Sequence, residues 1–307
     1  LSFNITDTTT VPLHQVFELA CERAAVRGIR VTGSELVGMI PLQIMLDTGR
    51  YFLKKQHRST GISDEEIIKI AVKSLGLDDL TPFDPKKKII EYQLENHTEK
   101  RLADMTITEF ANETASESPA PGGGSVSACM GALGAALGTM VANLSAHKKG
   151  WDDRWEEFSD WAEKGKQYHN RLLALIDEDT QAFNGIMTAF GLPKSTEEEK
   201  QIRHAAIQSA TKNAMEIPFQ VMQTACEAME IAKAMAETGN PNSVSDAGVG
   251  SLALRAAVIG AGLNVKINAS GLDDKIYVAE IQAKADELEQ KADEMEKAIL
   301  EIVKGKL

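Results

Sequence analysis

The spacing of apolar residues changes along the chain and divides it into two parts. In the first, short extended runs alternate with stretches of helical periodicity, at residues 3–6, 13–27, 29–32 and 41–55. Ser63 precedes Glu66 by three residues, the spacing of a capping box, and predicts a helix that ends near Gly76. Residues 1–95 are therefore expected to form an α+β unit.

After a polar, aperiodic stretch at residues 96–105, which we interpret as a linker, the strand signals almost vanish. Helical patterns cover residues 107–113, 125–146, 154–190, 196–238, 246–269 and 273–304. Thr196 and Glu199 form a second capping-box pattern. The last pattern carries an apolar stripe, typical of a packing or oligomer seam, at Ile281, Leu288, Met295, Ile299 and Ile302. Residues 106–307 are predicted to be all-helical.

Composition narrows the class of protein. The chain has 307 residues, of which 43% are hydrophobic, enough for a sizeable core and two domains. Its net charge of −12 makes nucleic acid an improbable partner. Three scattered cysteines and six dispersed histidines show no metal-ligand spacing, so we expect no metal and a reducing, cytoplasmic location.

One stretch, 126–146, carries no charge and is long enough to raise the question of a membrane. It consists mostly of Ala, Gly and Ser, whose transfer into lipid is weakly favourable. A tightly packed helix within a soluble domain is the better interpretation, with a membrane-embedded protein as the alternative. We expect no membrane partner.

The glycine run Gly122, Gly123 and Gly124 directly precedes that stretch. Glycine lacks a Cβ, so a bound group can approach the backbone, and the N–H groups at the helix start, with Ser125 and Ser127, favour an anion or a heterocycle edge. The alternative is a flexible linker ahead of a buried helix.

Asp179 interrupts an apolar stripe formed by Leu172, Leu175, Ile176, Ala182, Phe183 and Ile186. An acid on the core face has a raised pKa, as proton transfer near neutral pH requires. The alternative is a structural acid paired with a buried cation or a helix end. Asp177 lies about 200° around the helix, so a solvated side chain is expected there.

Two other polar positions are candidates. Asn264 and Asn268 share a helix face, and amides suit the reading of a heterocycle edge, although interhelical hydrogen bonds explain them equally well. Lys148 and Lys149 follow the glycine-led helix, where they either meet an anionic substrate tail or complement the helix dipole.

These motifs resemble one family, the formiminotransferase-cyclodeaminases. In the first part, residues 31–38, 75–85 and 89–92 are similar to the C-terminal subdomain of the transferase half. In the second, the similar segments are 121–127 (Pro-Gly-Gly-Gly-Ser-Val-Ser), 177–183 (Asp-Glu-Asp-Thr-Gln-Ala-Phe), 192–194, 245–246 and 264–268. The resemblance implies a truncated ferredoxin-like subdomain followed by an all-helical cyclodeaminase domain.

The resemblance also implies an activity, formimidoyltetrahydrofolate cyclodeaminase, which closes the ring of 5-formiminotetrahydrofolate and releases ammonia. Its substrate is a tetrahydrofolate derivative and it needs no metal. The transferase's N-terminal subdomain has no counterpart, so glutamate formimidoyl transfer is not expected. Family members form large rings, so a homo-oligomer through the helical domain is expected.

The family's aspartate maps onto the Asp-x-Asp segment, and periodicity prefers its second acid, Asp179, as the general base and acid. The substrate-binding candidates are Gly122, Gly123, Gly124, Ser125, Ser127, Lys148, Asp246 and Asn264. Two alternative functions stay open: a methenyltetrahydrofolate cyclohydrolase, and a noncatalytic helical oligomerisation module in which Asp179 is a paired structural acid.

Overall fold

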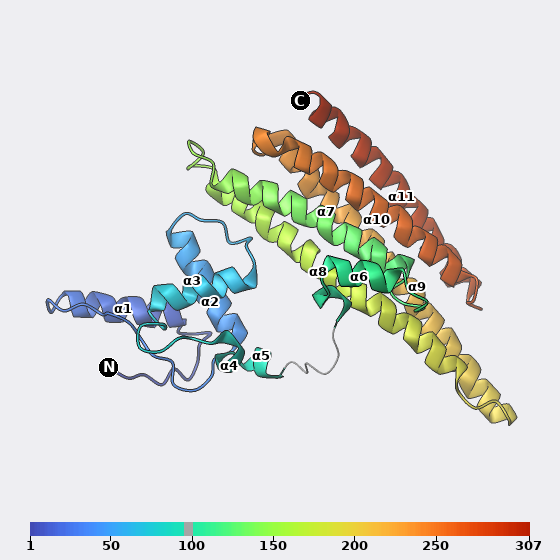
Figure 1. Cartoon of the computed structure of the whole chain (residues 1–307), viewed down its shortest axis with the longest axis horizontal. Coiled ribbons are helices and arrows are strands. Elements are labelled where there is room, and N and C mark those ends of the chain that lie inside the picture. Colours follow the sequence, from blue (N-terminus) through green and yellow to red (C-terminus); the bar gives the residue numbers. More distant parts are fainter. Residues whose placement is uncertain (95–100) are drawn as a thin grey trace.

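The computed structural model describes residues 1–94 and 101–307 and is built from helices (Figure 1). The first part holds α1 (Leu13–Ala25), α2 (Leu42–Lys55), α3 (Asp64–Leu75), α4 (Pro85–Lys88) and α5 (Ile90–Leu94). The second holds η1 (Leu102–Asp104), α6 (Ile107–Thr114), α7 (Gly123–Ala146), α8 (Trp155–Phe190), α9 (Glu197–Thr238), η2 (Pro241–Ser243), α10 (Val244–Ala269) and α11 (Lys275–Lys304).

The predicted ferredoxin-like α+β subdomain is wrong. No strand occurs within residues 1–94 or 101–307, and the extended runs 3–6 and 29–32 find no neighbouring strand. Phe3 and Ile29 are 54% and 62% exposed. One isolated parallel bridge, between Ile40 and Ile89, is all the pairing that forms in the described residues. A strand is stable only when its backbone groups pair with a neighbour, so extended propensity alone produced no sheet.

The predicted helices of the first part do form. The Ser63 hydroxyl accepts a hydrogen bond from the Glu66 N–H at 3.3 Å. α3 then ends at Gly76, whose φ of 63° suits a residue without a Cβ. Of the predicted linker, residues 96–100 lie outside the described residues, and 101–105 contain η1.

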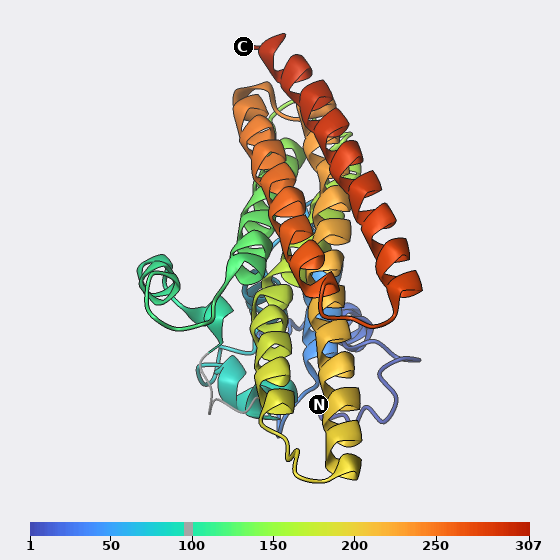
Figure 2. The same cartoon turned by 90° about the vertical axis from the view of Figure 1, so that its right-hand side faces the viewer.

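In the second part, α7, α8, α9 and α10 pack as neighbouring long helices, and α11 lies along α9 and α10 (Figure 2). Small residues permit close approach: a Cβ on Gly134 would lie 2.8 Å from the Gly250 carbonyl oxygen. The capping box of Thr196 and Glu199 is present. Ile281 and Ile299 are buried against the core, so the stripe of α11 packs within the chain. The predicted all-helical second part is confirmed.

Two stretches, Gly123–Ala146 and Pro241–Ala269, are long and apolar enough to cross a membrane on length and composition alone. Their most apolar windows are 61% and 50% buried inside the protein. Core helices of a soluble bundle have these same properties.

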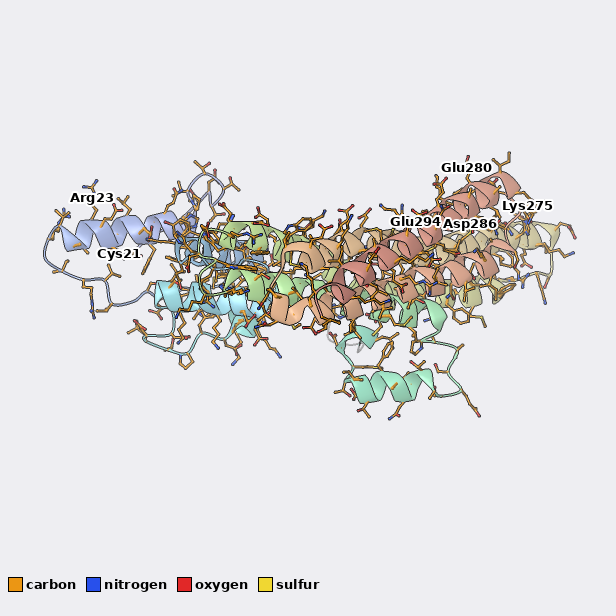
Figure 3. All side chains as sticks on the ribbon, turned by 90° about the horizontal axis from the view of Figure 1, so that it is seen from above. Cys21, Arg23, Lys275, Glu280, Asp286 and Glu294 are labelled. Carbon is orange, nitrogen blue, oxygen red and sulfur yellow. The ribbon has the colours of Figure 1, made fainter. Side chains whose placement is uncertain are left out.

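The short helix α6 lies apart from the bundle of long helices (Figure 3).

The loop between α2 and α3 docks the first part onto the bundle. Thr60 is buried, and its N–H donates to Ser159 Oγ of α8 at 3.0 Å. Asn143 Nδ2 of α7 donates to the Gly61 carbonyl at 3.0 Å. A Cβ on Gly61 would lie 2.3 Å from the carbonyl carbon of Ala162, so no larger residue fits there without movement.

We therefore expect Gly61→Ala to loosen this docking and to lower the free energy of unfolding by about 1–3 kcal/mol, the usual cost of overpacking. Calorimetry should show a lower melting temperature or a separate transition for the first part. Gly185→Ala is the matched control, because a Cβ there meets nothing within 4 Å. Equal stability of the two variants would contradict a tightly fitted loop.

Candidate functional site

Asp179 lies on the inner side of α8, among its buried apolar residues, and is held against the first turn of α7. Ser125 Oγ lies 2.9 Å from Asp179 Oδ2, and the Ser125 backbone N–H also donates to this carboxyl group. Burial raises the pKa of Asp179, whereas the two bonds from Ser125 act in the opposite direction and are the weaker effect. The predicted core-facing acid is therefore present, with a pKa above its ordinary value.

The Ser125 hydroxyl has one proton and two acceptors near it. Besides Asp179, the Ile176 carbonyl oxygen lies 3.0 Å from Ser125 Oγ. The Ser125 hydroxyl is the donor to both the Asp179 carboxyl group and the Ile176 carbonyl oxygen, so the two acceptors share its single proton. This sharing agrees with burial being the larger effect on the pKa of Asp179. Thr180 Oγ1, at 3.2 Å from the same hydroxyl, was missed by sequence reasoning because a threonine beside Asp179 gives no distinct signal.

The glycines at the start of α7 leave room for the Asp179 side chain. A Cβ on Gly124 would lie 2.1 Å from Asp179 Oδ1. The group that comes close to the backbone of Gly124 is therefore the Asp179 side chain, where the sequence predicted a bound ligand. Gly122 is the N-cap residue and provides no side-chain cap. The acid thus lies where the N–H groups of α7 carry partial positive charge.

Asn264 of α10 lies beside Gly123 in the first turn of α7. A Cβ on Gly123 would lie 3.1 Å from Asn264 Nδ2, which donates to the Gly260 carbonyl at 3.0 Å. Asn268, in contrast, is used in packing and donates to the Ala214 carbonyl at 2.7 Å. We call the residues that gather here the glycine-loop cluster: Gly122, Gly123, Gly124, Ser125, Ser127, Asp179 and Asn264.

Two candidates lie elsewhere. Lys148 follows the C-terminus of α7, a helix about 36 Å long, and its Nζ lies 4.0 Å above the Trp151 ring. Asp246 lies in the first turn of α10, 18 residues before Asn264 and so about 27 Å away. Within one chain, neither Lys148 nor Asp246 belongs to the glycine-loop cluster.

Asp177 has a structural role, and the expectation of a solvated side chain is wrong. Its carboxylate accepts hydrogen bonds from the N–H groups of Leu102 at 2.6 Å and Ala103 at 3.4 Å. Periodicity correctly turned this acid away from the core. It could not show that η1, some 75 residues earlier in the chain, would cover it.

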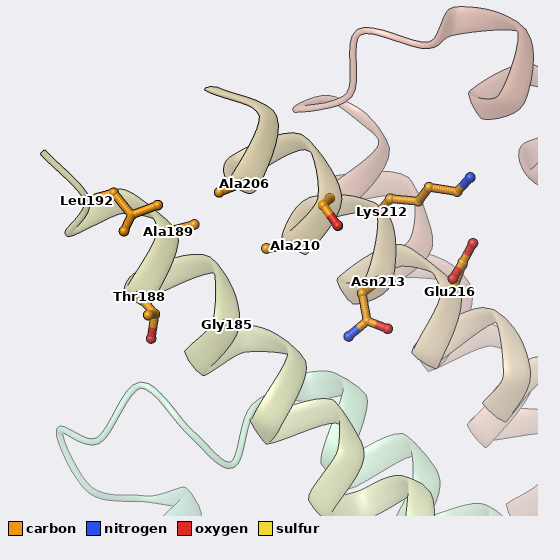
Figure 4. A pocket seen from close by; sticks show the side chains of 10 residues that line it. Gly185, Thr188, Ala189, Leu192, Ala206, Ala210, Lys212, Asn213 and Glu216 are labelled. Atoms are coloured by element: carbon orange, nitrogen blue, oxygen red, sulfur yellow. The ribbon is translucent and has the colours of Figure 1, made fainter. Parts of the chain in front are cut away.

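A cavity of about 660 Å³ lies between α8 and α9 (Figure 4). Its lining begins at Gly185, six residues after Asp179 and so about 9 Å further along α8. None of the predicted site residues lines it. The lining residues are Gly185, Thr188, Ala189, Leu192, Ala206, Ser209, Ala210, Lys212, Asn213 and Glu216.

Across 1–94 and 101–307, no group of three or more His, Cys, Asp or Glu side chains is arranged to hold a metal ion.

A long-helix bundle that holds a half-buried acid of raised pKa against the start of a glycine-led helix defines a class of acid–base site. Two family descriptions match the chain, "Formiminotransferase-cyclodeaminase" over residues 106–287 and "Formiminotransferase domain" over residues 1–95. The chain therefore belongs to the formiminotransferase-cyclodeaminase family.

Relatives agree with this membership. The formimidoyltransferase-cyclodeaminase of Gallus gallus is 37% identical over 281 residues, which are 91% of this chain and 52% of that protein. The methenyltetrahydrofolate cyclohydrolase of Methylorubrum extorquens is 40% identical over 66% of this chain and 97% of its own length. A crystal structure of formiminotetrahydrofolate cyclodeaminase from Thermotoga maritima superposes with a TM-score of 0.58 at 28% identity, covering 66% of this chain and 96% of that one.

The chain spans about half the length of the curated formimidoyltransferase-cyclodeaminases that it matches. The resemblance found in the sequence is thus confirmed. The match over residues 1–95 shows that a transferase portion is present, so the prediction that the transferase half lacks its N-terminal subdomain is only partly supported.

Because the pKa of Asp179 is raised in the folded protein, the stability of the fold should depend on pH through this residue. A buried acid stabilises the fold fully below the pKa of the unfolded chain, and this contribution is lost as pH rises through the folded-state pKa. Asp179→Asn cannot ionise, and its amide can still donate to Ser125. Its melting temperature relative to the unchanged protein should therefore increase as pH is raised above 3.8, the ordinary pKa of an aspartic acid.

Asp177→Asn is the matched control, because it replaces one of two oxygens that accept from η1 and should lower the melting temperature. Thermal denaturation of the three proteins across pH provides the measurement. A melting temperature of Asp179→Asn that falls below that of the unchanged protein as pH rises would show that the carboxylate is stabilised, not penalised, in the fold.

Proposed function

We propose that this chain catalyses the ring closure of 5-formiminotetrahydrofolate to 5,10-methenyltetrahydrofolate with release of ammonia. The observation that carries the proposal is the half-buried carboxyl group of Asp179, which is held by Ser125 at the start of α7. Membership of the family and the cyclodeaminase name of the Thermotoga maritima protein support it.

The reaction needs one proton acceptor and one donor. The nitrogen next to the benzoyl ring attacks the formimino carbon and loses its proton, and a carbon–nitrogen bond forms. The formimino group enters as its protonated amidinium cation, so the tetrahedral adduct carries an NH2 group. This group gains one proton and leaves as ammonia when its bond to carbon breaks, and the methenyl product keeps the positive charge. A single acid of raised pKa takes the first proton and returns one to the leaving nitrogen, so Asp179 serves as base and then as acid.

The rest of the glycine-loop cluster positions the substrate. Ring closure is intramolecular, so holding the two nitrogens around one carbon supplies much of the rate enhancement. The Asn264 side chain has an amide oxygen that can accept from the pterin ring, while its nitrogen is bound to Gly260. A Cβ on Gly122 would meet only the Pro119 carbonyl oxygen, at 3.9 Å, so a flat ring can approach the first N–H groups of α7 on that side. Ser127 donates to the Gly123 carbonyl at 2.7 Å and fixes this turn.

A methenyltetrahydrofolate cyclohydrolase is the second candidate, because the Methylorubrum extorquens relative of that name matches the bundle over nearly its whole length. That reaction would use water on the methenyl carbon in the same site. The matched transferase portion at residues 1–95 favours the deaminase, since the transferase produces the formimino substrate.

Ring closure places the chain in one-carbon and histidine metabolism. Absence of formimidoyl transfer and a cytoplasmic location stay predictions, as does folate as the partner, with or without a polyglutamate tail. Assembly into a homo-oligomer through the helical domain is likewise proposed.

The purified chain should form 5,10-methenyltetrahydrofolate from 5-formiminotetrahydrofolate, and Asp179→Asn should lower the rate about 10²- to 10⁴-fold, the usual loss when a general acid–base is removed. Ultraviolet absorbance follows the product, and an ammonia assay runs in parallel. Asp177→Asn, assayed at a temperature where it is folded, is the control and should keep most of the activity.

Full activity in a folded Asp179→Asn would assign the proton transfers to another group. Consumption of methenyltetrahydrofolate, without ammonia release from the formimino substrate, would instead identify the cyclohydrolase.

A further inference from the structure

The hydroxyl group of Ser125 has more neighbours than it has protons. Ser125 is 0% exposed, so its hydroxyl relies on partners within the protein. Three oxygen atoms lie near Ser125 Oγ: the Ile176 carbonyl at 3.0 Å, Asp179 Oδ2 at 2.9 Å and Thr180 Oγ1 at 3.2 Å. A hydroxyl donates one hydrogen bond and accepts up to two. Because a carbonyl and an ionised carboxylate only accept, Thr180 is the neighbour that can donate to Ser125 in every state of the acid.

The hydroxyl of Thr180 departs from the pattern that is usual within a helix. A threonine there commonly bonds the carbonyl four residues earlier. Thr188, about two turns further along α8, does so and donates to the Asn184 carbonyl at 2.9 Å. At the corresponding Ile176 carbonyl the side-chain donor is Ser125 of α7, and the Thr180 hydroxyl contacts Ser125. The contact between α7 and α8 has therefore redirected the Thr180 hydroxyl toward the glycine-loop cluster.

The state of Asp179 depends on Ser125 and not on a neighbouring charge. Burial raises the pKa of Asp179, the hydroxyl and the N–H of Ser125 lower it, and no charged side chain of the described residues contributes. α7 contains no charged residue. Charged groups of the surrounding elements are engaged with other partners: Asp177 with η1, Arg101 with Asp104, Arg171 with Glu178, Lys212 over the Tyr277 ring, Glu216 with the Tyr277 hydroxyl, Arg255 with Asp293 and Lys266 with Glu289.

We propose that Thr180 is a positioning residue for the general acid–base. It holds Ser125 so that the Ser125 proton can turn between Asp179 and the Ile176 carbonyl as Asp179 loses and gains its own proton. The inference rests on the proposed function for the step in which Asp179 takes up and releases a proton.

The two states differ only in where the Ser125 proton points. While Asp179 is ionised, the Ser125 hydroxyl donates to its carboxylate. When Asp179 takes the proton of the attacking nitrogen, its carboxyl group becomes neutral and a weaker acceptor, so the Ser125 proton turns to the Ile176 carbonyl. Return of a proton from Asp179 to the leaving nitrogen restores the first state. Ser125 and Thr180 keep their protons throughout.

Thr180 supports both states by donating to Ser125 Oγ. A hydroxyl that accepts one hydrogen bond becomes a stronger donor in another, so the Thr180 bond strengthens the bond from Ser125 to the carboxylate. It also fixes Ser125 Oγ between its two acceptors while the proton turns. Loss of the Thr180 hydroxyl should therefore weaken the support of the carboxylate and raise the pKa of Asp179 further.

The pH dependence of ring closure tests this role with Thr180→Val, which keeps the shape of threonine without its hydroxyl. The value of kcat/KM should rise with pH as Asp179 ionises to become the base, so a higher pKa moves this rise to higher pH. We expect Thr180→Val to lose about two- to threefold in kcat/KM on the rising limb and to recover at high pH. Thr180→Ser keeps the hydroxyl and should stay close to the unchanged chain.

A double-variant comparison shows whether Thr180 acts through Ser125. Ser125→Ala should lower kcat/KM on the rising limb about tenfold, because it removes a bond to the carboxylate itself. In that background Thr180→Val should cause no further shift of the pH profile. Thr188→Val is the matched control, since it makes the same replacement on the same helix at a hydroxyl that bonds the Asn184 carbonyl. Its pH profile should be unchanged.

The ionisation of Asp179 can also be followed without activity. Nuclear magnetic resonance of the chain labelled with ¹³C at the aspartate carboxyl groups gives one signal that Asp179→Asn removes, and its dependence on pH reports the titration. This titration should move to higher pH in Thr180→Val and Ser125→Ala, and stay in place in Thr180→Ser and Thr188→Val. Thermal denaturation checks that each variant is folded, and Thr180→Ala replaces Thr180→Val if the valine variant is not.

Three results would overturn the inference: an Asp179 titration that is the same in Thr180→Val and the unchanged chain, an equal loss of kcat/KM at every pH, or an effect of Thr180→Val that persists in full beside Ser125→Ala. A chain that shows the expected titrations without ring closure would instead reject the proposed function and leave the contacts of Thr180 and Ser125 with Asp179 intact. Ring closure with unshifted titrations would reject the role of Thr180 alone.

Discussion

The site depends on one contact, the close approach of Asp179 to the first turn of α7. Gly124 has no Cβ, so the carboxyl group reaches within contact of the backbone, and Ser125 binds it through both its hydroxyl and its N–H. Burial favours the protonated acid, and the Ile176 carbonyl shares the proton of the same hydroxyl. The partial positive charge at the start of α7 still makes ionisation accessible. These opposing effects suit an acid that must both give and take a proton.

Close helix packing makes this contact possible. Gly134 and Gly250 bring α7 against α10, and Gly131 lies against Leu172 and Ala257. Small residues along α7 therefore place its first turn, as well as its middle, within reach of α8 and α10. The same uncharged composition leaves an apolar outer stripe, so one helix both holds the acid and exposes apolar side chains such as Leu133, which is 59% exposed. The two properties come from one sequence feature.

The first part is coupled to the bundle through a fitted loop. Thr60 and Gly61 lie in contact with Ser159, Asn143 and Ala162, and Lys166 binds Asp64 at 2.5 Å. α8 carries both Asp179 and the docking residues Ser159, Ala162 and Lys166, which lie 13 to 20 residues before it. The loop therefore fixes the transferase portion relative to the helix that carries the proposed acid.

The sequence by itself determined the helices of the second part, the caps at Ser63 and Thr196, and the core-facing acid at Asp179, because periodicity and capping depend on residues a few positions apart. Only the tertiary structure decided the rest. The extended runs 3–6 and 29–32 found no partner strand, and pairing is a long-range event. The role of Asp177 depended on η1, and the approach of Asn264 to Gly123 depended on how α7 and α10 align. Local pattern specifies which face a residue takes, whereas contacts between distant segments decide what that face meets.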